Sequence, residues 1–156
     1  MQQSTHPSTL QFARVISVIA AALAASVLIY MVIAWIVVPT MANERMEFEQ
    51  LQLIALVLAV LSIGHLVAAQ VLFSTRVRAA ASLTSPEQRL ETYRTSFILA
   101  FALREAVAVY GLVLSFLGGD VRWALGFGAA ALLSMLLAWP KKSAIVQLGS
   151  EVPPIG

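Results

Sequence analysis

Two ionisable residues stand side by side within an otherwise apolar stretch of the sequence. Residues 95–117 hold Arg104 and Glu105, close to the middle of the run. If this run crosses a bilayer, insertion scales put the cost of a charge at its centre at about 2.5–3.5 kcal/mol. Adjacent residues on a helix point about 100° apart, so a direct ion pair between Arg104 and Glu105 is strained. We therefore expect at least one of them to face another helix or a wet cavity.

A second apolar run, residues 51–74, offers polar partners at the same depth. If the two runs pack antiparallel, Gly64 and His65 come level with Glu105. Gly64 would permit close approach of the helices, and His65 could donate a hydrogen bond to Glu105 or hold a water beside it. The cluster would either fix the register of the helices or let Glu105 bind and release an ion. The expected polar cluster consists of Ser62, Gly64, His65 and Arg104, with Gln70 as a further polar group.

The sequence provides little material for other chemistry. It has no cysteine, and its two histidines, His6 and His65, lack a spacing suited to metal ligands. No serine lies in a hydrolase motif, and no glycine-rich loop has the pattern of a phosphate site. The loop acids are interpreted as a solvated face; they are Glu44, Glu47 and Glu49. We expect no enzymatic activity, no catalytic residue, no metal and no cofactor.

The composition indicates that the helices carrying these polar residues lie in a membrane. Of 156 residues, 60% are apolar and 12% are charged, which is about half the charged share of a soluble domain. A helix that crosses about 30 Å of hydrocarbon needs about 20 residues, and its backbone must be satisfied internally. We expect an all-α integral membrane protein: a single transmembrane domain over residues 1–156, folded as four antiparallel helices. The expected spans are residues 15–38, 51–74, 95–117 and 123–139.

Positive charge predicts the orientation of these spans. The two tails and the middle loop carry seven Lys and Arg residues: Arg14, Arg76, Arg78, Arg89, Arg94, Lys141 and Lys142. The opposite side carries two, Arg45 and Arg122. This bias predicts a multi-pass protein of the cell membrane with both termini in the cytoplasm. The first run is longer than the apolar part of a signal peptide and is interpreted as an uncleaved span. Tyr30 and Tyr93 are expected to be interface anchors near helix ends.

The third run also contains a recognisable stretch. From Glu105 to Val113 it reads Glu-Ala-Val-Ala-Val-Tyr-Gly-Leu-Val, and a polar loop with Pro86-Glu87 precedes it. This pattern resembles the ion-binding helix of subunit c of rotary ATP synthases. With the fainter match at Ser62-Ile63-Gly64, the resemblance covers residues 55–117. It implies that Glu105 carries a proton or sodium ion and that Tyr110 helps to shape its site.

Other features of the sequence differ from that family. Gly64 stands alone where the inner helix of subunit c has a glycine repeat, Arg104 lies beside the carboxylate, and two further runs flank the hairpin. We therefore expect a small polytopic inner-membrane protein with a structural or partner-binding role. The alternative is proton or sodium translocation, or sensing, through Glu105. The expected surroundings are the lipid bilayer and either a homo-oligomer or other membrane proteins, without nucleic acid.

Overall fold

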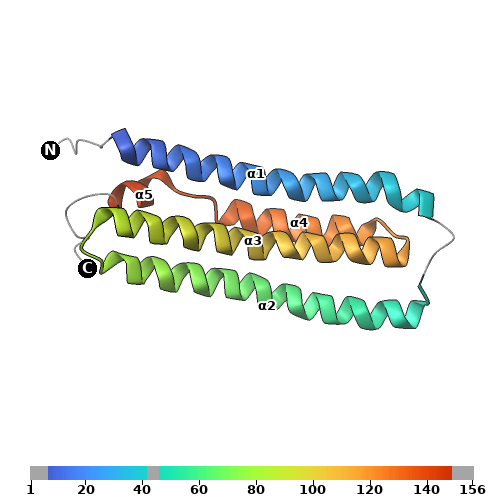
Figure 1. The fold of residues 1–156 in the computed structure, drawn as a ribbon. Coiled ribbons are helices and arrows are strands. Elements are labelled where there is room, and N and C mark those ends of the chain that lie inside the picture. Colours follow the sequence, from blue (N-terminus) through green and yellow to red (C-terminus); the bar gives the residue numbers. More distant parts are fainter. Residues whose placement is uncertain (1–6, 42–45, 149–156) are drawn as a thin grey trace.

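The protein is a bundle of long helices. The computed structural model describes residues 7–41 and 46–148, and every regular element in these ranges is helical (Figure 1). This confirms the all-α prediction for the described part of the chain. The elements are α1 (Pro7–Val37), a 3-10 turn η1 (Val38–Met41), α2 (Phe48–Ala81), α3 (Pro86–Gly118), α4 (Arg122–Leu137) and the short α5 (Lys142–Leu148).

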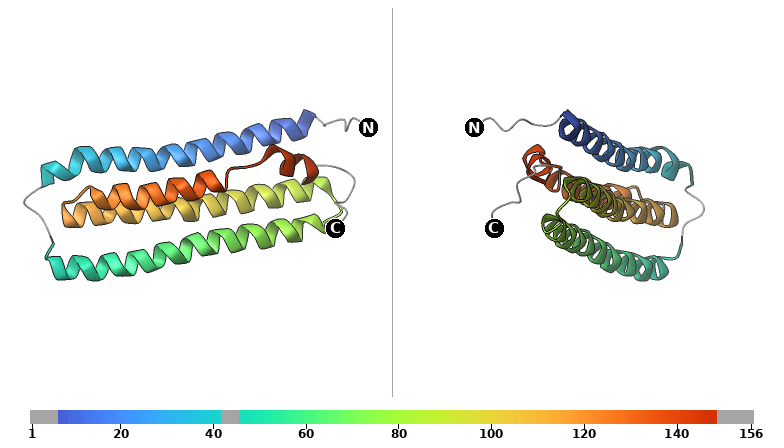
Figure 2. Two further views of the ribbon diagram at one scale, coloured as in Figure 1. Left: turned by 180° about the vertical axis from the view of Figure 1, so that it is seen from behind. Right: turned by 60° about the vertical axis from the view of Figure 1, so that its left-hand side comes forward.

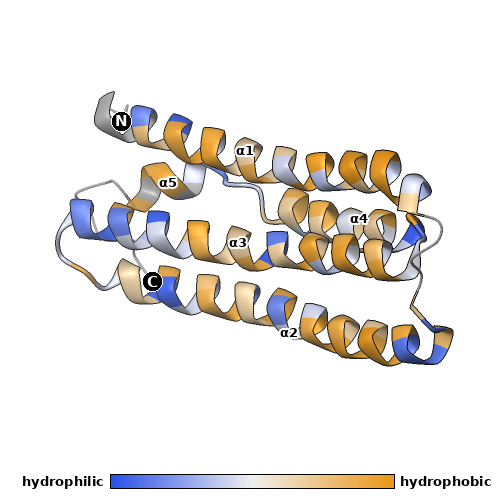
Figure 3. Cartoon of the chain, turned by 45° about the vertical axis from the view of Figure 1, so that its right-hand side comes forward, coloured by the Kyte–Doolittle hydropathy of each residue, from blue (hydrophilic) through white to orange (hydrophobic). Residues whose placement is uncertain are grey.

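Three of these helices, α1, α2 and α3, are long and apolar enough to cross a membrane. Helix α4 is shorter than its predicted span, with 16 residues. At 1.5 Å per residue it rises about 24 Å, less than the hydrocarbon thickness of about 30 Å. Beyond its end the chain turns into α5, which packs against α1 and α3. Ile145 and Leu148 of α5 are buried there. Hydrophilic residues gather at the helix ends, with isolated ones inside the bundle (Figure 3).

Helix α3 occupies the centre of the arrangement. It packs against α2, α4 and α1, and α1 also packs against α4. Helices α1 and α2 lie on opposite sides of the α3–α4 pair, so the bundle is open rather than square (Figure 2). Successive long helices run in opposite directions, and the start of α1 lies at the same end as α5 (Figure 1). The central position of α3 explains why its buried residues recur every three or four positions along its whole length.

Aromatic side chains pack together along the N-terminal half of α3 and against α2. The rings of Phe97 and Phe101 stack with centroids 4.2 Å apart, and Tyr93 stacks on Phe97 at 6.2 Å. Phe73 of α2 meets Tyr93 edge-on. Such pairs contribute about 0.5–1.5 kcal/mol beyond the burial of their area. Tyr93 is 3% exposed and belongs to this core, which corrects its expected role as an interface anchor.

Helix α4 reaches α3 at a glycine. A Cβ placed on Gly111 would lie 2.5 Å from the Cβ of Phe127 and 2.8 Å from the carbonyl oxygen of Trp123. One turn further on, the buried Ser115 Oγ accepts a hydrogen bond from the backbone N–H of Ala124 at 2.8 Å. That N–H belongs to the first turn of α4 and has no partner within its own helix. Gly111 thus permits the close approach, and Ser115 caps the helix that makes it.

Replacing Gly111 with alanine should destabilise the protein. The added methyl group overlaps the backbone of α4, and overpacking of this kind costs about 1–3 kcal/mol. The matched control is Gly64→Ala, where a Cβ meets nothing within 4 Å. The control should be neutral or stabilising by up to about 1 kcal/mol, because alanine favours a helix. Unfolding free energies in mixed micelles compare the two variants, and equal stability would contradict the packing of α3 on α4.

Candidate functional site

The carboxyl group of Glu105 points from α3 toward α1. Its Oε1 accepts hydrogen bonds from the Ser26 hydroxyl at 2.5 Å and from the Tyr30 hydroxyl at 2.8 Å. Ser26 and Tyr30 are four residues apart and therefore share one face of α1. All three side chains are half-buried. Two short hydrogen bonds to one carboxyl oxygen join α1 to α3 at this depth.

The hydroxyl groups around Glu105 can serve either protonation state. Ser26 Oγ also lies 2.7 Å from the carbonyl oxygen of Leu23, but a hydroxyl has one proton to donate. With an ionised carboxylate, Ser26 donates to Oε1. With a protonated carboxyl, Oε1 can donate to Ser26, and Ser26 then donates to Leu23. Tyr30 donates to Oε1 in both cases. The two hydroxyl groups can thus hydrogen-bond to the carboxyl group in either form.

Arg104 turns the other way, toward α2 and α4. Its side chain is buried at 3% exposure. One terminal nitrogen donates to the carbonyl oxygen of Ala100 at 3.1 Å and the other to Gln70 Oε1 of α2 at 3.3 Å. The guanidinium carbon lies 5.5 Å from the centre of the Phe101 ring, within cation–π range. The expectation that at least one of the two neighbouring side chains would face another helix is confirmed, because Glu105 contacts α1 and Arg104 contacts α2.

His65 does not reach Glu105. Its Nδ1 lies 2.9 Å from the carbonyl oxygen of Leu61 on its own helix, and its ring lies 5.6 Å from the ring of Tyr110. Tyr110 is five positions beyond Glu105, which turns it about 140° around α3. Tyr110 therefore contacts α2, while Glu105 faces α1. This arrangement corrects two expectations: that His65 would donate to Glu105, and that Tyr110 would help to shape the site of the carboxylate.

The remaining members of the expected cluster also lie apart. Ser62 is buried, but its hydroxyl donates to the carbonyl oxygen of Leu58 on the same helix at 2.7 Å. Gly64 is exposed and marks no close approach of another helix. It is two residues beyond Ser62, about 200° around the helix, so it faces outward. The single polar cluster predicted around Glu105 is therefore wrong, because the angular positions on α2 and α3 send its members to different contacts.

The two partners of Glu105 were missed because they lie on α1. Tyr30 was expected to be an interface anchor, and the structure corrects this by placing its hydroxyl on Glu105. A signal for the pair does exist in the sequence. Ser26 and Tyr30 are two hydrogen-bonding residues at positions i and i+4 in an otherwise apolar run. That spacing marks one polar face on an apolar helix, which a buried carboxyl elsewhere in the chain can use.

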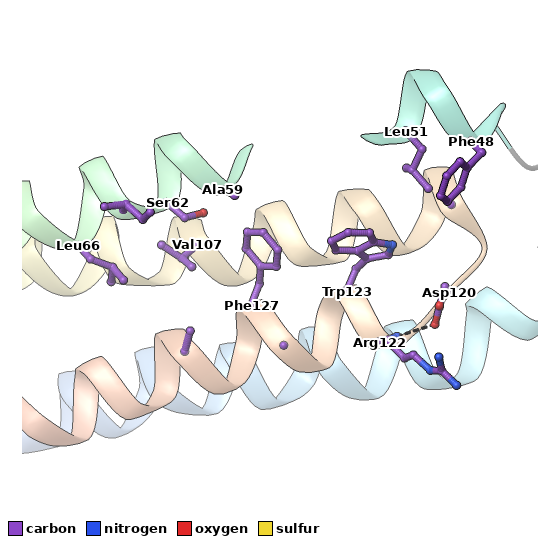
Figure 4. A pocket seen from close by; sticks show the side chains of 14 residues that line it. Phe48, Leu51, Ala59, Ser62, Leu66, Val107, Asp120, Arg122, Trp123 and Phe127 are labelled. Carbon is purple, nitrogen blue, oxygen red and sulfur yellow. Dashed lines mark hydrogen bonds between the residues drawn. The ribbon is translucent and has the colours of Figure 1, made fainter. Parts of the chain in front are cut away.

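A cavity of about 760 Å³ lies between α2 and α4 (Figure 4). The rings of Trp123 and Phe127 extend from α4 into it, and Val107 of α3 forms part of its floor. Its wall on α2 extends from Phe48 to Leu66. The cavity is mainly apolar, and it lies on the side of α3 that does not face α1.

No family model, curated protein or solved structure matches this chain.

Removing the Tyr30 hydroxyl should loosen α1. Hydrogen bonds between membrane helices contribute about 0.6 kcal/mol on average and up to about 1.7 kcal/mol, and a carboxyl partner favours the upper part of this range. We expect Tyr30→Phe to lower the unfolding free energy by about 1–2 kcal/mol. The control is Tyr110→Phe, which removes a hydroxyl that makes no hydrogen bond to the described residues and should change stability little. Both unfolding free energies are measured in mixed micelles. An equal decrease in the two variants would contradict a stabilising hydrogen bond from Tyr30 to Glu105.

Proposed function

We propose that this chain is an integral membrane protein that binds an apolar transmembrane helix, from a partner protein or a second copy of the chain. The binding site is the cavity between α2 and α4. The role is one of assembly rather than enzymatic catalysis. Three helices long and apolar enough to cross a membrane support the placement in a bilayer.

The proposed orientation is that of a cell-membrane protein with both termini and the α2–α3 turn in the cytoplasm. Four arginines near that turn support it: Arg76, Arg78, Arg89 and Arg94. The starts of α1 and α5 lie at the same end of the bundle, where Arg14 and Lys141 add positive charge (Figure 1). Positive charge concentrates on cytoplasmic segments of membrane proteins. In this orientation α4 is the fourth span, and α5 lies at the cytoplasmic end.

The observation that carries the proposal is the length and lining of the cavity. Its α2 lining residues lie between Phe48 and Leu66, a stretch of 19 residues that rises about 27 Å, which is close to the thickness of the hydrocarbon. On α4 its lining includes Gly126 and Ala130, four residues apart and both exposed. Small residues at this spacing let another helix come close enough to gain dispersion energy, which drives helix association in lipid. Ala59 on α2 is small as well.

A bulky residue at position 126 should block this association. We expect Gly126→Leu to reduce co-purification and cross-linking of the chain with its membrane partner, or with a tagged second copy, by about tenfold. Gly64→Leu is the matched control, because Gly64 is also an exposed helical glycine with open space but does not line the cavity. Association that survives Gly126→Leu, or that fails equally in Gly64→Leu, would rule out the cavity between α2 and α4 as the binding site.

A second candidate function is proton or sodium binding at Glu105, leading to translocation or sensing. A specific arrangement favours it: both hydroxyl partners of the carboxyl fit its ionised and its protonated form. No basic side chain among the described residues pairs with Glu105 within 4.0 Å. The exposed ion pair of α3 joins Arg94 to Glu91, nearer the start of the helix. The resemblance of residues 105–113 to the subunit c helix supports the same chemistry.

Labelling with dicyclohexylcarbodiimide tests this second candidate, because the reagent attacks protonated carboxyl groups in apolar surroundings. We expect modification of Glu105 that declines as the pH rises, since ionisation removes the reactive form, and that declines with added sodium if sodium binds. Glu105→Gln should abolish both the labelling and any ion flux into vesicles. Absence of labelling between about pH 5 and 9 would exclude ion binding at Glu105 and leave the carboxyl as a tie between helices.

A further inference from the structure

Arg104 has more hydrogen-bond donors than the surrounding protein uses. A guanidinium carries five N–H groups, and two of them donate to Ala100 and Gln70. Three N–H groups therefore make no hydrogen bond within the described residues, although the side chain is only 3% exposed. The amide nitrogen of Gln70 also donates to none of the described groups. Both terminal nitrogens of Arg104 have a partner, and its Nε is not sealed within the protein, so the spare N–H groups are open to a ligand.

A cavity of about 290 Å³ adjoins these donors. It lies between α2 and the last turn of α4 and is lined by Leu66, Gln70, Arg104, Ser134, Leu137 and Ala138. A neighbouring cavity of about 250 Å³ shares Gln70, Leu137 and Ala138 with it and extends to Tyr93, Trp139 and Lys141. The two cavities therefore adjoin, one beside Arg104 and the other beside the exposed Lys141. The ammonium group of Lys141 thus adds a second positive charge at the neighbouring cavity.

The local charges favour an anion with a single charge. No carboxylate lies within 4.0 Å of Arg104 in the described residues, and Glu105 is engaged with Ser26 and Tyr30 on the opposite side of α3. The nearest negative potential comes from the end of α4, where a helix carries about half a unit of negative charge. The net charge is then about +0.5 before Lys141 is counted. One negative charge changes this to about −0.5, whereas two would change it to about −1.5. The charge of Lys141 is exposed and screened by water, so it offsets the difference only weakly.

We propose that the cavity beside Arg104 binds a small monocarboxylate anion. The planar fork of a guanidinium matches the two oxygens of a carboxylate, and the Gln70 amide adds a further donor. The apolar side chains of Leu66 and Leu137 suit a short alkyl group. A lipid phosphate does not fit the same place, because Arg104 lies near the middle of α3 and far from the headgroup level of a bilayer.

Acetate and propionate are the probes, with the full chain in detergent. Equilibrium dialysis with radiolabelled acetate and thermal unfolding with sodium acetate, sodium sulfate or sodium phosphate, at matched ionic strength, measure binding and its selectivity. We expect saturable acetate binding and a rising Tm with acetate or propionate, and neither effect with sulfate or phosphate. Arg104→Gln should weaken acetate binding about tenfold or more, because a charged hydrogen-bond donor is lost.

Two further variants keep the test decisive. Arg94→Gln removes an exposed arginine that pairs with Glu91 and should bind acetate like the unaltered chain. Gln70→Leu retains the guanidinium and should weaken binding several-fold, so it reports on the site even if Arg104→Gln fails to fold. The proposal fails if the unaltered chain shows no saturable binding, if sulfate or phosphate binds as well as acetate, or if Gln70→Leu binds acetate unchanged.

Discussion

Arg104 and Glu105 point to opposite sides of α3, and each bonds to a different neighbouring helix. Glu105 accepts two hydroxyl groups from α1, and Arg104 donates to Gln70 of α2. The angle of about 100° between successive helical residues makes this division possible. A charge at the centre of a bilayer costs several kcal/mol. Here both side chains make hydrogen bonds that join α3 to its neighbouring helices. Helix α3 has to be central, because both of its costly side chains need a partner.

This division also explains the open shape of the bundle. With α1 and α2 held on opposite sides of α3, the fourth helix can cover only one of the remaining gaps. Helix α4 lies against α3 and α1, where Gly111 allows a close approach to α3 and Gly128 packs against Met31 of α1. The other gap, between α2 and α4, remains as the large apolar cavity. On the α4 side this cavity is lined by the small residues Gly126 and Ala130 as well as by Trp123 and Phe127.

The separation of the two charges gives them different chemistry. Glu105 accepts hydrogen bonds from two hydroxyl groups of α1, and no charged side chain of the described residues pairs with it. Arg104 retains its charge in proteins and lies beside a cavity that adjoins the one beside Lys141. Had the two side chains formed an ion pair with each other, they would not make these separate contacts with α1 and α2. The contacts of Glu105 with α1, the cavity between α2 and α4 and the cavity beside Arg104 occupy different parts of the molecule.

The sequence by itself determined that the chain is helical with long apolar segments, and it singled out Arg104 and Glu105 as charges within one of them. Low charge and long apolar runs predict membrane helices, and these properties depend on composition and period alone. The exceptional character of Arg104 and Glu105 also follows from their place within a run. The tertiary structure decided which helix each side chain meets: Tyr30 rather than His65 for Glu105, and Gln70 for Arg104. Depth along a helix can be counted from the sequence, but the rotation of each helix about its axis depends on packing across the whole bundle.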